Sequence, residues 1–301
     1  MTERSAGAAL PAFAPDAALR AKLANLSLVS QRPHGHLHTG GRRSRATGSS
    51  LEFADHRSYS PGDDYRQIDW NIYARTDELF VKVRESEETL VVHLLLDVSG
   101  SMASGAPAKL EAAQAVLAAL GWTALASRDV VAGAALGNDL GETFAPRQGE
   151  AYVARLFEFL ERQRPSGETG LSRGVAAYNA RALPHGVAVL ASDLLAPDAP
   201  RAIGSLAQRG HEVTVIHVLD DEFVNPAFAD EVELVDAERG DALEVLGDGD
   251  LLRAYRQAIG DWTSDLQRFC HRRHVRYVPI RSNWAVEDIV LRRLREHGTL
   301  A

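Results

Sequence analysis

The sequence predicts an α/β fold, a doubly wound and mostly parallel sheet covered by helices on both faces. Three observations lead to this expectation. Short apolar runs alternate with amphipathic helical patterns along most of the chain. The central apolar runs are continuous, as in strands that are buried on both faces. Of the 301 residues, 45% are hydrophobic and 25% are charged, which is the balance of a globular protein with a real core.

The chain divides into three predicted parts. Residues 1–50 are expected to hold a helix near 16–29, followed by a flexible loop rich in Gly, Arg and His. Residues 51–88 predict a small β-rich extension around a Ser-Pro-Gly-Asp-Asp turn, because Pro and Gly favour turn geometry. Residues 89–301 carry the α/β alternation.

The α/β part begins with an apolar run at 90–96 that ends at Asp97. Further strands are predicted at 130–136, 187–191, 213–218 and 275–280. Amphipathic stripes predict helices at 110–124, 153–160, 171–183, from about 200, and at 252–269. A small hairpin is expected at 232–245, inserted before the long helix.

Polar residues stand where two of these strands end. Asp97 opens a D-x-S-x-S sequence that includes Ser99 and Ser101. Asp193 closely follows the predicted strand at 187–191. Thr169 lies between them in a Gly-flanked loop. Because ligands bind outside the carboxyl ends of strands in open α/β sheets, we expect these side chains to converge. Two carboxylates and three hydroxyls suit a hard cation, so Mg2+ is predicted, with Mn2+ or Ca2+ as alternatives.

Asp, Ser and Gly are also favourable residues in turns and helix caps. Their position after a strand is therefore equally consistent with a role in shaping the turn alone. Taken together, five residues resemble the metal-ion-dependent adhesion site of von Willebrand factor type A domains: Asp97, Ser99, Ser101, Thr169 and Asp193. The resemblance implies that the hydroxyls ligate directly and that the aspartates act partly through water. It also implies that an acidic residue of a protein ligand completes the metal's coordination shell.

A second stretch, residues 57–70, is called the signature segment below, and it resembles the signature of the bacterial family named domain of unknown function 58. That family is commonly associated with MoxR-type AAA+ ATPases, which implies an adaptor or co-chaperone function. Without the resemblance, the segment's charges and aromatics fit either a salt-bridged turn that caps the sheet or a docking surface. The candidate docking residues are Arg57, Tyr59, Gly62, Asp63, Asp64, Arg66, Asp69 and Trp70.

Composition narrows the classes of partner. With 33 Lys and Arg against 41 Asp and Glu, the net charge of -8 disfavours nucleic acid as a partner. No apolar run approaches the roughly 18 residues of a spanning helix, so we expect no membrane span, although many family members carry one. The single cysteine, Cys270, forms no intrachain disulfide and fits a reducing, cytoplasmic compartment. The sequence leaves the oligomeric state open.

The main prediction is a non-enzymatic, Mg2+-dependent protein-binding module. A Mg2+-dependent phosphohydrolase of haloacid dehalogenase type is the alternative, with Asp97 as nucleophile. Such an enzyme is expected to have a second aspartate two residues later as general acid. This chain has Ser99 there, which disfavours the alternative.

Overall fold

The computed structural model describes residues 10–30, 43–47, 53–60, 65, 68–87, 89–167, 170–226, 231–235, 242–246 and 249–301. Two compact units divide the chain. The first consists of Met1–Ser30 and Leu90–Ala301, and the second of Gln31–Thr89. These boundaries differ from the sequence-derived parts in two ways. The N-terminal residues group with the α/β part, and the segment predicted as a flexible loop contains a strand, β1 (Arg43–Thr47), of the second unit.

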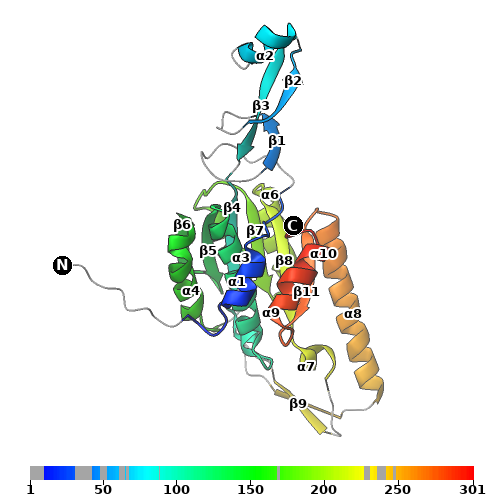
Figure 1. Cartoon of the computed structure of the whole chain (residues 1–301). Helices are drawn as coiled ribbons and strands as arrows, with labels where there is room; N and C mark the ends of the chain where they lie inside the picture. Colours follow the sequence, from blue (N-terminus) through cyan, green and yellow to red (C-terminus); the bar gives the residue numbers. More distant parts are fainter. Residues whose placement is uncertain are drawn as a thin grey trace, which may run out of the picture. The chain divides into compact units, whose positions relative to one another are not determined.

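The first unit is built on a six-stranded sheet in the order β11-β8-β7-β4-β5-β6 (Figure 1). Neighbouring strands are parallel, except that β6 is antiparallel to β5. The predicted fold class, α/β with a mostly parallel sheet, is therefore confirmed. The strands are β4 (Val91–Asp97), β5 (Val130–Leu136), β6 (Leu140–Gln148), β7 (Val187–Ser192), β8 (Glu212–Leu219) and β11 (Arg276–Arg281).

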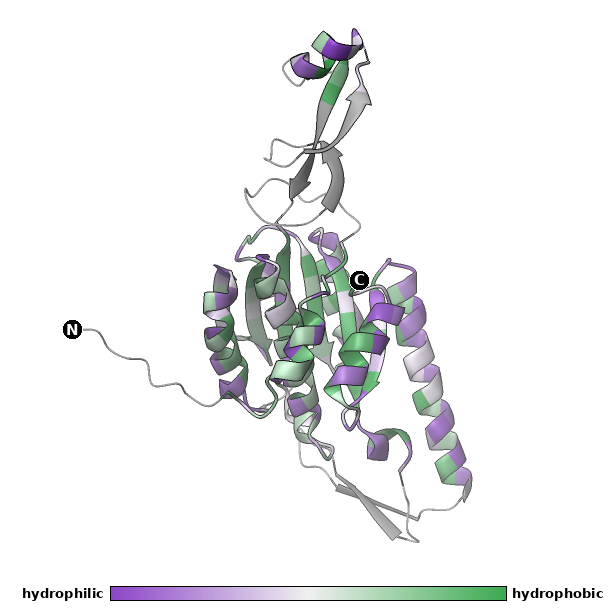
Figure 2. Cartoon of the chain, viewed as in Figure 1, coloured by the Kyte–Doolittle hydropathy of each residue, from purple (hydrophilic) through white to green (hydrophobic). Residues whose placement is uncertain are grey.

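Helices cover both faces of this sheet. They are α1 (Ala17–Leu23), α3 (Lys109–Ala126), α4 (Val153–Arg162), α5 (Leu171–Asn179), α6 (Ala199–Gln208), α7 (Asp221–Val224), α8 (Gly249–His271), α9 (Val286–Asp288) and α10 (Leu294–Glu296). Alternate residues of β4 serve the two faces, as strand geometry requires. Leu94 and Leu96 join a core with α1, α3 and α4, whereas Leu95 joins a second core with α5, α6 and α8. Figure 2 shows the apolar strands between helices whose hydropathy is mixed.

The N-terminal segment is part of the first unit's core. Asp16 caps α1 by accepting a hydrogen bond from the Leu19 amide at 2.7 Å. Leu19 and Leu23 are buried, and Leu28 pairs with Leu300 in an isolated antiparallel bridge. The helix is shorter than the predicted 16–29, because the residues after it become extended to make this bridge.

Strand β6 was not predicted from the sequence. It lies at the edge of the sheet and pairs only with β5 among the strands that the structure describes. Most of its residues are exposed or half-buried, with Phe144 as the buried exception. Pro146 and the charged residues within it are typical of edge strands and conceal the apolar signal that marks a central strand.

The predicted hairpin is present as β9 (Glu231–Val235) and β10 (Ala242–Leu246), which are antiparallel with Val235 opposite Ala242. Its turn lies outside the described residues.

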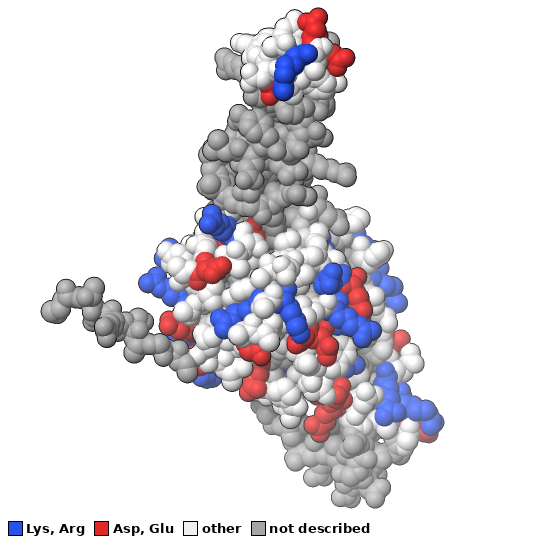
Figure 3. All heavy atoms as spheres, viewed as in Figure 1, with Lys and Arg blue, Asp and Glu red and all other residues white. Residues whose placement is uncertain are grey.

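Among the residues that the structure describes, no helix combines the length and the hydrophobicity that crossing a membrane requires. Lys and Arg side chains lie beside Asp and Glu side chains across the face shown in Figure 3.

In its described residues, the second unit contains a three-stranded antiparallel sheet in the order β1-β3-β2 and a short α-helix. The elements are β1 (Arg43–Thr47), β2 (Phe53–Ser58), α2 (Trp70–Thr76) and β3 (Phe80–Glu87). The Asp69 carboxylate caps α2 by accepting hydrogen bonds from the Asn71 and Ile72 amides at 2.9 and 3.3 Å. The signature segment therefore leads directly into a capped helix.

Candidate functional site

The strand order places a topological switch point between β4 and β7. From β4 the chain first adds β5 and β6 on one side, and later adds β7, β8 and β11 on the other. Ligands of open α/β sheets bind outside the carboxyl ends of the strands at such a point. Three neighbouring strands end in aspartate there: Asp97 closes β4, Asp193 follows β7 and Asp220 follows β8.

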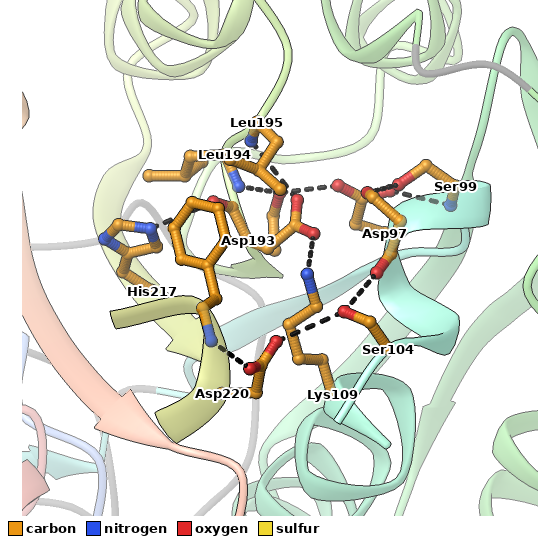
Figure 4. A network of polar contacts seen from close by, with 12 residues as sticks. Asp97, Ser99, Ser104, Lys109, Asp193, Leu194, Leu195, His217 and Asp220 are labelled. Carbon is orange, nitrogen blue, oxygen red and sulfur yellow. Dashed lines mark hydrogen bonds and ion pairs between the residues drawn. The ribbon is translucent and has the colours of Figure 1, made fainter. Parts of the chain in front are cut away.

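The loop after β4 holds Asp97 and Ser99 fully buried and Ser101 5% exposed. The Asp97 carboxylate accepts hydrogen bonds from the Ser99 amide at 2.9 Å and from the Ser192 hydroxyl at 2.5 Å. The Ser99 and Ser101 hydroxyl oxygens lie 3.1 Å apart. Asp97 and Ser99 therefore lie together at this sheet edge (Figure 4), and the Ser101 hydroxyl lies next to that of Ser99.

Asp193 lies in the same buried region but has a cationic partner of its own. Its Oδ2 accepts a hydrogen bond from Lys109 Nζ at 2.5 Å, and its Oδ1 accepts one from the Leu195 amide at 3.2 Å. Lys109 is the first residue of α3, and Figure 4 shows its side chain extending from that helix toward Asp193. The two side chains are 2% and 1% exposed, so this is a buried ion pair.

The third strand-end aspartate, Asp220, braces the loop after β4 from the other side. Its Oδ1 accepts a hydrogen bond from the Phe223 amide at 2.6 Å and caps α7. Its Oδ2 accepts one from the Ser104 hydroxyl at 3.2 Å, and that hydroxyl lies 3.1 Å from the Ser101 carbonyl oxygen. Gly105 is required beside it, because a Cβ there would stand 3.0 Å from the Asp220 Cβ and the backbone φ is +98°.

A neutral histidine supports the backbone of Asp193. His217 Nε2 lies 2.9 Å from the Asp193 carbonyl oxygen, and Nδ1 lies 2.5 Å from the Tyr277 hydroxyl. A carbonyl can only accept, so Nε2 carries the proton and the tyrosine donates to Nδ1. Burial lowers the pKa of His217 to about 4, which keeps the ring uncharged at neutral pH.

The charge of Asp193 acts on Asp97. Burial and the charge of Asp193 raise the pKa of Asp97 to about 6, against the opposing hydrogen bonds from Ser192 and Ser99. A positive charge bound beside Asp97 would lower this pKa again, because it would favour the ionised carboxylate.

The donor set fits a hard divalent cation. We call Asp97, Ser99, Ser101 and Asp193 the oxygen cluster; all four side chains present only oxygen, which Mg2+ prefers. In the described parts of the chain, no group of three or more His, Cys, Asp or Glu side chains is arranged to hold a metal. The hydroxyls of Ser99 and Ser101 would therefore have to complete the set of metal ligands. The remaining predicted ligand, Thr169, lies outside the described residues.

The structure separates the residues of the signature segment into different roles. Asp69 is buried and serves as the helix cap, whereas Trp70 is 59% exposed. The Tyr59 amide donates a hydrogen bond to the Leu79 carbonyl at 2.8 Å, and Arg57 lies in β2. The others fall outside the described residues: Gly62, Asp63, Asp64 and Arg66.

Sequence reasoning missed Lys109, Ser192 and Asp220. Asp220 carries the same signal as Asp97, an aspartate at the end of an apolar strand, and the same rule finds it. Lys109 carries a weaker signal: a cation in the first turn of a helix opposes the helix dipole and needs a compensating partner. Ser192 has no comparable signal, because the last residue of a strand is often a small polar one.

A family model described as "Protein of unknown function DUF58" matches residues 55–262. The match covers more than half of the chain, so the protein belongs to this family, in agreement with the resemblance of the signature segment. Two relatives are "Uncharacterized protein Mb1516" of Mycobacterium bovis and "Uncharacterized protein Rv1480" of Mycobacterium tuberculosis. Each is 30% identical over 296 residues, which cover 95% of this chain and 92% of the relative.

Solved structures with partial similarity include "conserved hypothetical protein BatB" from Bacteroides thetaiotaomicron, 14% identical with a TM-score of 0.41. This match covers 70% of the chain and 98% of BatB. A von Willebrand factor type A protein from Catenulispora acidiphila is 16% identical with a TM-score of 0.35, over 46% of the chain and 35% of that protein. At these TM-scores the similarity carries no weight for function.

Proposed function

We propose that this protein is a metal-ion-dependent protein-binding module of the von Willebrand factor type A kind, with Mg2+ as its ion. One observation carries the proposal: Asp97, Ser99 and Ser101 meet at the switch point of the sheet, with their oxygens packed together below the surface. A buried all-oxygen group at this location has the chemistry of a hard-cation site.

The chain's own residues prepare the site. The Ser99 amide and the Ser192 hydroxyl fix the orientation of the Asp97 carboxylate, so little conformational entropy remains to be lost on binding. The Ser99 and Ser101 hydroxyls stand beside each other on one short turn. When bound, Mg2+ supplies an electrophilic position to which a partner's carboxylate can attach.

We further propose that the partner is a MoxR-type AAA+ ATPase and that the module serves it as adaptor or co-chaperone in the cytoplasm. Support comes from membership in the family and from the resemblance of the signature segment. The module is proposed to be non-enzymatic, because Ser99 cannot act as the carboxylic general acid that a haloacid dehalogenase type phosphatase needs. Asp97-dependent turnover of a phosphate ester would contradict this part of the proposal.

The exposed aromatic side chains of the second unit are the candidate docking surface for that ATPase. Trp70 is 59% exposed and Tyr73 38% exposed, and their rings meet edge to face with centroids 6.0 Å apart. Tyr65 is 64% exposed. Exposed aromatics are enriched in binding hot spots, whereas a solvated helix seldom carries several.

The test is capture of partners from a native lysate by the parent protein and by Asp97→Asn, each with Mg2+ or with chelator. Asp265→Asn serves as the matched control, because Asp265 is an exposed aspartate on α8. The proposal expects an AAA+ ATPase to be retained only by the parent and the control, and only with Mg2+. Equal retention in every condition would contradict it.

A further inference from the structure

Lys109 places its ammonium group beside the oxygen cluster. Its Nζ lies 2.5 Å from Asp193 Oδ2 and 6.0 Å from the centroid of the Phe223 ring. The side chain is 2% exposed. The other short Lys ion pair in the described structure, between Lys22 and Glu287, has the same 2.5 Å separation but is about half exposed.

Stability alone is a weak reason for such a pair. A buried ammonium and a buried carboxylate both lose their hydration, and apolar residues of similar size often stabilise a fold as well or better. Lys109 also opens a helix, where the dipole disfavours a cation. Its position beside the candidate metal ligands therefore points to a role in the site.

We propose that Lys109 competes with the divalent ion for Asp193 and thereby sets the metal affinity of the site; this inference rests on the proposed function. The ammonium neutralises Asp193, which leaves Asp97 as the uncompensated carboxylate of the oxygen cluster. Lys109 thus acts as a specificity-determining residue that keeps divalent binding weak. Lys109 also gives the Mg2+-bound site a net positive charge, which favours an acidic ligand.

The first experiment measures Mg2+ binding by calorimetry to the full-length parent, Lys109→Met and Lys22→Met. Removing the ammonium frees the Asp193 charge, so Lys109→Met is expected to bind Mg2+ about tenfold tighter or more. Without metal its melting temperature should fall, and Mg2+ should raise it more than it raises that of the parent. Lys22→Met should bind Mg2+ like the parent. Equal or weaker binding by folded Lys109→Met overturns the inference.

A second variant protects the test against loss of folding. Lys109→Met/Asp193→Asn removes both charges of the pair and leaves no unpaired buried charge. If Lys109 cancels Asp193 in the parent, this double variant should bind Mg2+ within about threefold of the parent, because the cluster keeps the same net charge. A loss of tenfold or more would show that Asp193 binds the ion despite Lys109, and would overturn the inference.

The results separate this inference from the proposed function. Mg2+ binding by Lys109→Met but not by the parent supports the competition and contradicts a metal-dependent function of the parent. Mg2+ binding of equal strength by both contradicts the competition alone. Absence of binding in both overturns the two together.

Discussion

The oxygen cluster of the first unit and the signature segment of the second unit have opposite solvent environments. Asp97, Ser99 and Asp193 are almost completely buried and joined to neighbours by short hydrogen bonds. Trp70 and Tyr65, in contrast, leave more than half of their surface exposed. The same family model spans both regions. The contrast indicates a site whose chemistry depends on desolvated charge and a surface whose binding depends on exposed apolar area.

The largest expected effect concerns charge in the buried region. Lys109→Met leaves Asp193 as an unpaired buried charge, so without metal the free energy of unfolding should fall by about 3–5 kcal/mol. Lys22→Met removes an exposed pair of equal length and should leave the free energy of unfolding nearly unchanged, because solvent screens the pair. Chemical denaturation in chelator measures both. A loss below about 1 kcal/mol for Lys109→Met would show that the site is more hydrated than the structure indicates.

The next effect separates function from stability at Asp97. Asp97→Asn should lower Mg2+-dependent partner capture by at least about tenfold, because an uncharged amide oxygen binds a divalent cation more weakly than a carboxylate does. Stability should change little, since removing a disfavoured buried charge, indicated by the pKa of about 6, offsets the loss of one of the two hydrogen bonds that the carboxylate accepts. Circular dichroism melting and quantified pull-down test the two halves. A strongly destabilised variant would contradict the assigned electrostatics.

Mg2+ binding should depend on pH through the same residue. The pKa of Asp97 is raised to about 6, so the proton competes with the ion below that pH. The affinity for Mg2+ should fall by about tenfold per pH unit below pH 6 and level off above it. The folded protein without metal behaves oppositely: it holds this proton more tightly than the unfolded chain, so stability falls as pH rises from about 4 to 6. Calorimetry between pH 5 and 7.5 tests the binding; a constant affinity contradicts this role of Asp97.

The smallest expected effect on stability lies in the signature segment. Trp70→Ala should change the free energy of unfolding by about 0.5 kcal/mol or less, because the ring is mostly solvated. If the aromatic surface binds the ATPase, capture should weaken by about 1–2 kcal/mol, a typical hot-spot loss. Ile68→Ala is the contrasting variant, since Ile68 is buried and its truncation should destabilise the second unit. Unchanged capture by Trp70→Ala would indicate that the signature segment has a structural role and does not bind the ATPase.

Central features of the fold were predictable because their signals are local. The interior strands β4, β5, β7 and β8 are buried on both faces, and runs rich in apolar residues indicate this burial directly. Edge strand β6 was not predictable in the same way, since its exposed residues carry no such run. The length of α1 also escaped prediction, because the pairing of Leu28 with Leu300 decides where the helix ends.

The oxygen cluster shows the same division. Asp97 and Asp193 were found because both stand where apolar strands end, and an α/β sheet brings strand ends to one edge. Their partners were decided by tertiary structure alone. Lys109 meets Asp193 across 84 residues of sequence, and Ser192 meets Asp97 across 95. No periodicity or motif encodes a contact between residues so far apart, because it arises only when neighbouring elements pack. The sequence by itself therefore determined the oxygen chemistry at this sheet edge, and the folded structure decided which charges are already paired there.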